Sequence, residues 1–228
     1  MDLNGDKKLD VVVANNGSSN VSILLGNGDG TFQAQAAATV AGTQPTSIIL
    51  ADFNSDQKLD FATTDLNGGN VTVRLGNGNG GFGVGSTPMG VTAPIDLIAG
   101  DFNADKKPDL AIANSTVATV RIALGAGDGT FMNGATPAVT TSISGRSITV
   151  GDLNLDGILD LVVSNVAASN VSILLGKGDG TFDPQQTFAM GAQPSHINLA
   201  DLNRDGLPDL LATDQSAGAV SVRLAQCQ

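Results

Sequence analysis

The sequence predicts an all-β fold, a β-propeller of about five four-stranded blades in which both terminal blades are incomplete. A pattern Asp-x-Asn-x-Asp-x-x-x-Asp recurs about every fifty residues, starting at positions 2, 52, 101, 152 and 201. A second marker, Leu-Gly-x-Gly-x-Gly-x-Phe, occupies residues 25–32, 75–82, 124–131 and 175–182. Val, Ile, Leu and Ala alternate with turn residues, and no helical period is present. Four short strands in a repeat of this length are typical of a propeller blade, so residues 1–228 form a single predicted domain of five repeats.

The fourth repeat shows how the four strands of a blade are predicted. Residues 147–152 alternate apolar with small or polar side chains and lead directly into the Asp pattern. Residues 161–165 follow that loop, and residues 171–175 come after a turn rich in Ser and Ala. A glycine-rich turn then precedes a more irregular outer strand over residues 181–190. The Asp loop is therefore expected between the first and second strands of every blade.

The two ends of the chain predict unfinished blades. The first repeat begins at its Asp loop, without the strand that precedes this loop elsewhere, and the fifth repeat stops before its outer strand. We therefore expect about eighteen strands, where five complete blades need about twenty. Three outcomes stay open: a piece of a longer propeller, a closed ring with two thinned blades, or neighbouring molecules that complete each other. Unpaired edges favour pairing with another chain, so flanking repeats or other copies of this chain are the expected partners.

The charge of the chain favours cation binding. The formal net charge is −11, and all 22 acidic residues are Asp. Such an acidic chain is a poor partner for nucleic acid or for an anionic membrane surface. No apolar run reaches the eighteen or more residues of a membrane span, so none is predicted. The single cysteine, Cys227, allows no disulfide within the chain.

The Asp patterns predict five calcium sites. Calcium prefers six to eight oxygen ligands, and a loop that curls around the ion presents side chains at positions one, three and five. Position seven supplies a backbone carbonyl, and a carboxylate at position nine completes the shell. Position seven varies freely among Lys, Ile and Leu, as expected of a backbone ligand. The predicted ligands are Asp2, Asn4, Asp6, Lys8 and Asp10; Asp52, Asn54, Asp56, Lys58 and Asp60; Asp101, Asn103, Asp105, Lys107 and Asp109; Asp152, Asn154, Asp156, Ile158 and Asp160; and Asp201, Asn203, Asp205, Leu207 and Asp209.

Charge balance agrees with about five bound Ca²⁺ ions. The five loops contain 15 of the 22 Asp residues, and five divalent ions would change the net charge from −11 to −1. The alternative is that Asp and Asn simply form Asx-turns between strands. Position six is Gly only in the fourth and fifth loops (Gly157 and Gly206). If this position needs a positive φ, the first three loops are strained and bind calcium more weakly.

These loops, together with the Gly/Phe turn, resemble the FG-GAP/VCBS repeat family, whose calcium-bearing propellers occur in integrin α-subunits and in secreted bacterial proteins. The resemblance covers nearly the whole chain. It implies calcium binding, an extracellular location, and a role in adhesion, ligand recognition or scaffolding. The sequence departs from the family by lacking Gly at position six in three loops. It also has about five repeats, where seven blades are usual.

The remaining motifs are predicted to be structural. The Gly-x-Gly-x-Gly stretches lie between two strands and not between a strand and a helix, so we expect hairpins and not phosphate-binding loops. The recurring phenylalanines are expected in the core between blades. They are Phe32, Phe82, Phe131 and Phe182.

No catalytic constellation is recognised, so the chain is predicted not to be an enzyme. His196 and its counterparts Ser47, Asp96 and Ser147 fall on first strands, which line the channel of a propeller. A catalytic role would require them to converge from different blades. The alternatives are a propeller domain of a secreted polysaccharide-active hydrolase or lyase, and a lectin with a glycan ligand. The chain has no Trp or Tyr on which a sugar would stack.

Overall fold

A computed structural model describes residues 1–34, 39–40, 42–86, 91–134 and 145–225. In these residues the protein is all-β, with eighteen strands in five antiparallel sheets and no helix. The predicted all-β propeller with incomplete terminal blades is therefore confirmed. A search of the same residues for helices long and apolar enough to cross a membrane finds none.

The five sheets follow one another along the chain, and the middle three have four strands each. The first sheet contains β1 (Val11–Asn15), β2 (Asn20–Leu24) and β3 (Thr39–Val40); the second β4 (Pro45–Ala51), β5 (Asp60–Asp65), β6 (Asn70–Gly76) and β7 (Phe82–Val84); the third β8 (Pro94–Gly100), β9 (Asp109–Asn114), β10 (Val120–Gly125) and β11 (Phe131–Asn133); the fourth β12 (Gly145–Gly151), β13 (Asp160–Asn165), β14 (Asn170–Leu174) and β15 (Gln186–Ala189); and the fifth β16 (Pro194–Ala200), β17 (Asp209–Asp214) and β18 (Ala219–Arg223).

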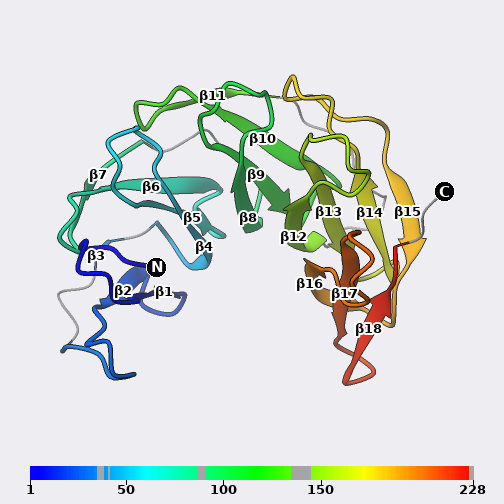
Figure 1. Ribbon diagram of the computed structural model, residues 1–228, viewed down its shortest axis with the longest axis horizontal. Coiled ribbons are helices and arrows are strands. Elements are labelled where there is room, and N and C mark those ends of the chain that lie inside the picture. The colour runs from blue at the N-terminus through cyan, green and yellow to red at the C-terminus, as the bar shows by residue number, and fades with distance from the viewer. Residues whose placement is uncertain (35–38, 41, 87–90, 135–144, 226–228) are drawn as a thin grey trace.

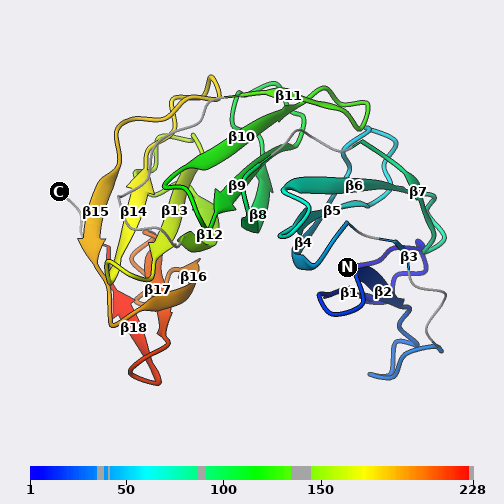
Figure 2. The same cartoon turned by 180° about the vertical axis from the view of Figure 1, so that it is seen from behind.

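The sheets are arranged as the blades of an open arc (Figures 1 and 2). The strands β4, β8, β12 and β16 lie on the concave side, and each contacts the next. The first and fifth sheets stand at opposite ends of the arc. The fourth blade corrects one prediction: its outer strand covers Gln186–Ala189 and not residues 181–190, and Phe182 forms only an isolated bridge with Gly176.

Apolar side chains fill the space between neighbouring sheets. Phe131 of the third sheet packs edge-on against Phe53 of the second Asp loop, with 5.5 Å between ring centroids. Phe182 packs in the same way on Phe102, at 5.9 Å. Phe82 packs on Phe61 at 4.8 Å. The predicted core position holds for these three, but Phe32 is 44% exposed because no sheet precedes the first one in the structure.

The first glycine of the Leu-Gly-x-Gly-x-Gly-x-Phe marker lies against the Asp loop of its own blade. A Cβ atom built on Gly76 would be 2.1 Å from the carbonyl oxygen of Leu59, at position eight of the loop. The equivalent distances in the other blades that carry this glycine are 2.1 Å for Gly26, 2.2 Å for Gly125 and 2.3 Å for Gly176. The two repeating motifs are thus coupled by a close backbone contact that only glycine permits.

We expect Gly76→Ala to destabilise the protein by about 2–3 kcal/mol, the upper part of the range for overpacking, because backbone must shift to admit the methyl group. Gly83→Ala is the matched control in the same sheet, since its nearest atom would lie at an ordinary 3.8 Å. Chemical denaturation of both variants measures the difference. Equal stabilities of the two variants would contradict the close contact.

Candidate metal centres

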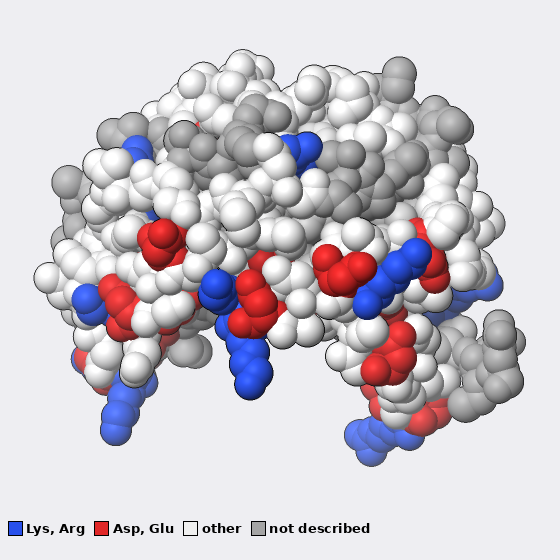
Figure 3. Space-filling model, turned by 90° about the horizontal axis from the view of Figure 1, so that it is seen from above, with Lys and Arg blue, Asp and Glu red and all other residues white. Residues whose placement is uncertain are grey.

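All five Asp loops precede the second strand of a blade, at the same end of the sheets. The loops of the second to fifth blades connect β4 to β5, β8 to β9, β12 to β13 and β16 to β17. In the space-filling view, acidic side chains form separate patches along one side of the molecule, with basic side chains beside them (Figure 3). The predicted ligands therefore lie in five separate loops and not in one shared cluster.

In each loop the side chains at positions one, three and five turn back onto the loop's own backbone. In the second loop, Asp52 accepts hydrogen bonds from the backbone N–H groups of Asp56 (3.1 Å) and Gln57 (2.7 Å). Asn54 Oδ1 also accepts from Asp56 N (3.1 Å), and Asp56 Oδ1 accepts from Lys58 N (3.0 Å). The same bonds from positions five, six and seven recur in the third, fourth and fifth loops. In the first loop Asp2 accepts from positions three, four and six.

This curled conformation requires a left-handed backbone at two positions. Position six has φ of 64° at Lys7, 66° at Gln57 and 66° at Lys106, and is glycine in the other two loops. The positive φ expected at this position is therefore present, and the first three loops carry a side chain there. Position four is also left-handed, for example 61° at Ser55 and 60° at Leu155, which the sequence pattern did not reveal. A left-handed non-glycine residue costs about 1–2 kcal/mol, so the loops are strained.

The carboxylate at position nine has a different environment, because it is buried beneath the loop. Asp60 is fully buried; its Oδ2 accepts from Phe53 N (2.8 Å) and its Oδ1 from Gly76 N (2.7 Å). Asp109 bonds in the same way to Phe102 N and Gly125 N. Desolvation by burial raises the pKa of Asp60 and of Asp109, although these N–H groups act in the opposite direction. The carboxylate at position nine therefore connects the loop, through hydrogen bonds, to the turn between the third and fourth strands, with or without a bound metal. The equivalent bonds occur at Asp10, Asp160 and Asp209.

The donors in these loops suit calcium in kind, since carboxylate, amide and carbonyl oxygens are its preferred ligands. In the part of the chain that is described, however, no group of three or more acidic, His or Cys side chains lies close enough together to hold a metal. The loop bonds are also those of Asx-turns. Calcium binding and the individual ligands therefore stay predictions.

Lysine distinguishes the first three loops from the last two. Lys58 Nζ lies 3.4 Å from Asp56 Oδ2, and Lys8 and Lys107 pair with Asp6 and Asp105 at 3.4 and 3.9 Å. Partial desolvation tends to raise the pKa of Asp56. Hydrogen bonds from Lys58 and Asn54, together with the charge of the Lys58 ammonium group, outweigh this and lower the pKa. In the fourth and fifth loops the same carboxylate oxygen instead accepts from the position-three Asn, at 2.9 Å in both. The ammonium group of a lysine thus partly neutralises the carboxylates in each of the first three loops.

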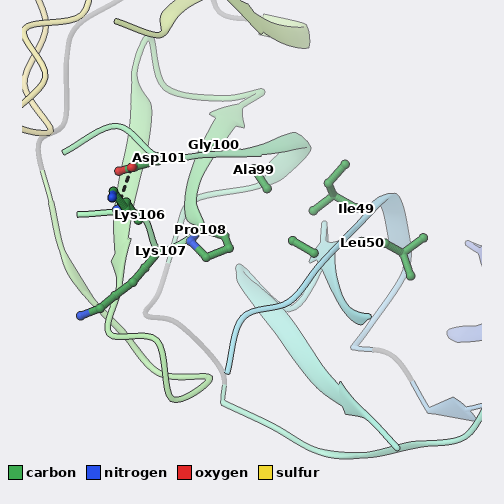
Figure 4. A pocket seen from close by; sticks show the side chains of 9 residues that line it. Ile49, Leu50, Ala99, Gly100, Asp101, Lys106, Lys107 and Pro108 are labelled. Carbon is green, nitrogen blue, oxygen red and sulfur yellow. Dashed lines mark hydrogen bonds between the residues drawn. The ribbon is translucent and has the colours of Figure 1, made fainter. Parts of the chain in front are cut away.

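The third loop also borders a cavity of about 320 Å³ between the second and third sheets (Figure 4). Its apolar wall includes Ile49 and Leu50 of β4 and Ala99 of β8. Asp101 and Lys106 lie at its edge, where the Lys106 N–H donates to Asp101 Oδ2 at 2.8 Å. The third loop therefore lies beside the space between two blades.

The first-strand residues noted in the sequence do converge from different blades. Ser47, Asp96 and His196 line one cavity of about 350 Å³ at the concave side of the arc. Ser147 is buried and is not part of this lining, but its Oγ lies 3.4 Å from His196 Nδ1. The sequence placed these residues on equivalent strands, but only the packing of the blades shows that they meet.

A family model described as FG-GAP-like repeat matches the chain four times, over residues 2–63, 52–112, 101–163 and 158–212. Together these segments cover most of the chain. The chain belongs to the FG-GAP-like repeat family. No curated protein matches it.

Three solved structures with similar folds are longer than this FG-GAP chain. One is a functionally unknown protein from Desulfotomaculum acetoxidans, at 17% identity and a TM-score of 0.65, with 94% of this chain and 65% of that chain covered. Another is a candidate 6-phosphogluconolactonase from Bacteroides uniformis, at 17% identity and a TM-score of 0.70, with 96% of this chain and 64% of that chain covered. A third is the periplasmic gluconolactonase of Pseudomonas aeruginosa, at 18% identity and a TM-score of 0.68, with 98% of this chain and 65% of that chain covered. The chain thus spans slightly less than two thirds of these proteins.

These matches contradict the prediction that the chain is not an enzyme. At such identities the likeness shows the fold alone, but two of these three proteins of that fold are named as lactonases. The prediction depended on the lack of a familiar catalytic constellation in the sequence. That lack does not separate enzymes from other propellers, because residues from different blades can form a site.

Proposed function

We propose that the chain is a calcium-binding FG-GAP propeller module that acts outside the cell as a scaffold or adhesive unit. The observation that carries the proposal is the recurrence, in all five blades, of a strained loop that turns two carboxylates and an amide oxygen toward its own backbone. Five uniform loops with non-glycine residues at positive φ are costly as plain turns. A bound ion would offset that strain and the repulsion among the carboxylates.

The expected strength of the sites supports the proposed extracellular location. Lysine pairs weaken calcium binding in the first three loops. The second and third loops also have two left-handed non-glycine residues each, where every other loop has one. Sites of low affinity fill only at the millimolar calcium of extracellular modules. The resemblance to secreted calcium-bearing propellers points the same way.

Calcium titration tests the proposal. We expect about five ions per chain in two classes, with the fourth and fifth loops binding more tightly than the first three, because they have no lysine on the position-five carboxylate. Asp156→Asn should remove one tight site, and Asp56→Asn, its matched counterpart, should remove one weak site. Isothermal titration calorimetry on the wild type and both variants measures the two classes. A wild-type chain that binds no calcium at millimolar concentration would contradict the proposal, and so would an unchanged stoichiometry in both variants.

The two end sheets support a proposal about partners. Val220 on β18 is 60% exposed, whereas Val71 and Val171 at the same position of complete blades are fully buried. Val13 on β1 is 39% exposed, whereas its counterpart Thr63 is fully buried. A further blade of the same kind would cover these faces, and in a solution of this chain a second copy supplies one. Light scattering should therefore show calcium-dependent self-association that Val220→Asp reduces. A monodisperse monomer at high concentration in calcium would contradict it.

An enzymatic activity is the second candidate, favoured by the convergence of Ser47, Asp96 and His196 on one cavity. The names of similar propellers suggest a lactone as the first substrate to test. Turnover that Asp96→Asn abolishes in a folded protein would establish it, and turnover that Asp96→Asn leaves unchanged would exclude this cavity as its site.

A further inference from the structure

The cavity on the concave side is assembled from four blades. The strands β4, β8, β12 and β16 lie side by side there, and each contributes residues from its first half (Figure 1). The cavity volume of about 350 Å³ lies at the lower end of the range for small-molecule sites, roughly 300–1,000 Å³. Six of its seven lining residues have polar side chains; the lining consists of Thr46, Ser47, Ile95, Asp96, Arg146, Ser195 and His196.

One half of the cavity is built around the carboxylate of Asp96. Ser47 Oγ donates to Asp96 Oδ1 at 2.6 Å, and the backbone N–H of Ile148 donates to Asp96 Oδ2 at 3.0 Å. These partners come from the second and fourth sheets, so three blades fix the orientation of the carboxylate. The backbone N–H of Leu97 also donates to Asp96 Oδ1, at 3.0 Å. Oδ2 accepts only from Ile148 among the described residues, so Asp96 keeps acceptor capacity through Oδ2.

The other half carries the imidazole of His196 and the guanidinium of Arg146. Ser147 Oγ is 3.4 Å from His196 Nδ1, and it also accepts from Ile197 N at 3.4 Å. Arg146 is exposed and donates to Gln215 Oε1 at 3.1 Å through Nη1. Guanidinium has five N–H donors, so Arg146 retains a fork suited to a carboxylate or a phosphate.

The chemistry of these groups selects a class of ligand. The hydroxyls of Thr46, Ser47 and Ser195 already donate within the protein. Their oxygens and the carboxylate of Asp96 therefore offer acceptors to the hydroxyl groups of a ligand. Ile95 is the only apolar residue of the lining, so an apolar or aromatic ligand gains little. One Arg beside one Asp favours a ligand with a single negative charge over a dianionic phosphate. We propose that this cavity binds a small polyhydroxylated carboxylate, that is, a sugar acid.

The test compares four probes on the calcium-loaded protein: D-gluconate, D-galacturonate, D-glucose and glucose 6-phosphate. Free calcium is held constant, because sugar acids themselves chelate it. Ligand-observed NMR or calorimetry should show the two sugar acids binding at least about tenfold more tightly than the other two, as expected for one hydrogen-bonded charge pair. Arg146→Gln should remove this preference, and Arg146→Lys should keep only part of it, since the ammonium lacks the bidentate fork.

Lys177→Gln serves as the control, because it removes a charge that is paired with Asp183 in the glycine-rich turn and does not line the cavity. It should leave the affinities unchanged. Circular dichroism establishes that each variant is folded. Equal binding of glucose, tighter binding of glucose 6-phosphate, no binding of either sugar acid at tens of millimolar, or full binding by folded Arg146→Gln would each overturn the proposal. Calcium binding is measured separately, so failure here does not alter the calcium proposal.

Discussion

Removal of calcium with EDTA should lower the melting temperature by well over ten degrees relative to millimolar calcium. A ligand that binds only the folded state stabilises it by RT ln(1 + [L]/Kd), about 1.4 kcal/mol for each site at ten times Kd. Five such sites contribute about 7 kcal/mol, and 1 kcal/mol shifts the melting temperature of a chain this long by about 2–4 °C. Without the ion, the crowded carboxylates of each loop also repel one another.

A thermal melt followed by circular dichroism measures this difference. Magnesium at the same concentration is the control for ionic strength and divalent charge, and we expect it to restore little of the lost stability, because it demands a stricter octahedral shell. Identical melting temperatures in EDTA and in calcium would contradict the assignment of the loops.

Asp60→Ala should cost about 3–5 kcal/mol, the largest effect expected of any single substitution. Removal of the carboxylate leaves the N–H groups of Phe53 and Gly76 buried without an acceptor. An orphaned buried donor costs about 1–3 kcal/mol, and a cavity adds to that. The loss should persist in EDTA, because these hydrogen bonds do not depend on a metal. Chemical denaturation with and without calcium measures both values.

Asp183→Ala is the control, since this exposed carboxylate forms only a surface ion pair with Lys177 at 2.9 Å. Exposed pairs contribute about 0–1 kcal/mol. If Asp60→Ala in EDTA is no more costly than Asp183→Ala, position nine has no structural role of its own and serves only as a metal ligand.

Much of this fold is predictable from local pattern. The Asp loop, the second strand, the third strand and the glycine turn are encoded in adjacent residues, and their repetition fixes the blade. The positive φ expected at position six is present at Lys7, Gln57 and Lys106. Turn chemistry acts over a few residues, so a short pattern is enough to reveal it.

Features that depend on contacts between distant residues were not predictable in the same way. In the sequence, Asp60 belongs to the Asp loop. The backbone N–H that it accepts from, that of Gly76, lies sixteen residues further along the chain, and the two groups meet only when the sheet forms. Phe32 has the same motif context as Phe131, yet it is exposed, since burial depends on the neighbouring sheet. The cavity around Asp96 and His196 arises from the angle between blades, for which no local pattern exists.

A crystal structure of the protein grown in millimolar calcium, with anomalous diffraction data collected where calcium scatters, tests the central claim most directly. The account predicts one anomalous peak inside each Asp loop. In the fourth loop the ion should contact the side chains of Asp152, Asn154 and Asp156 and the carbonyl oxygen of Ile158. Loops without peaks, closed only by the hydrogen bonds of Asx-turns, would contradict it.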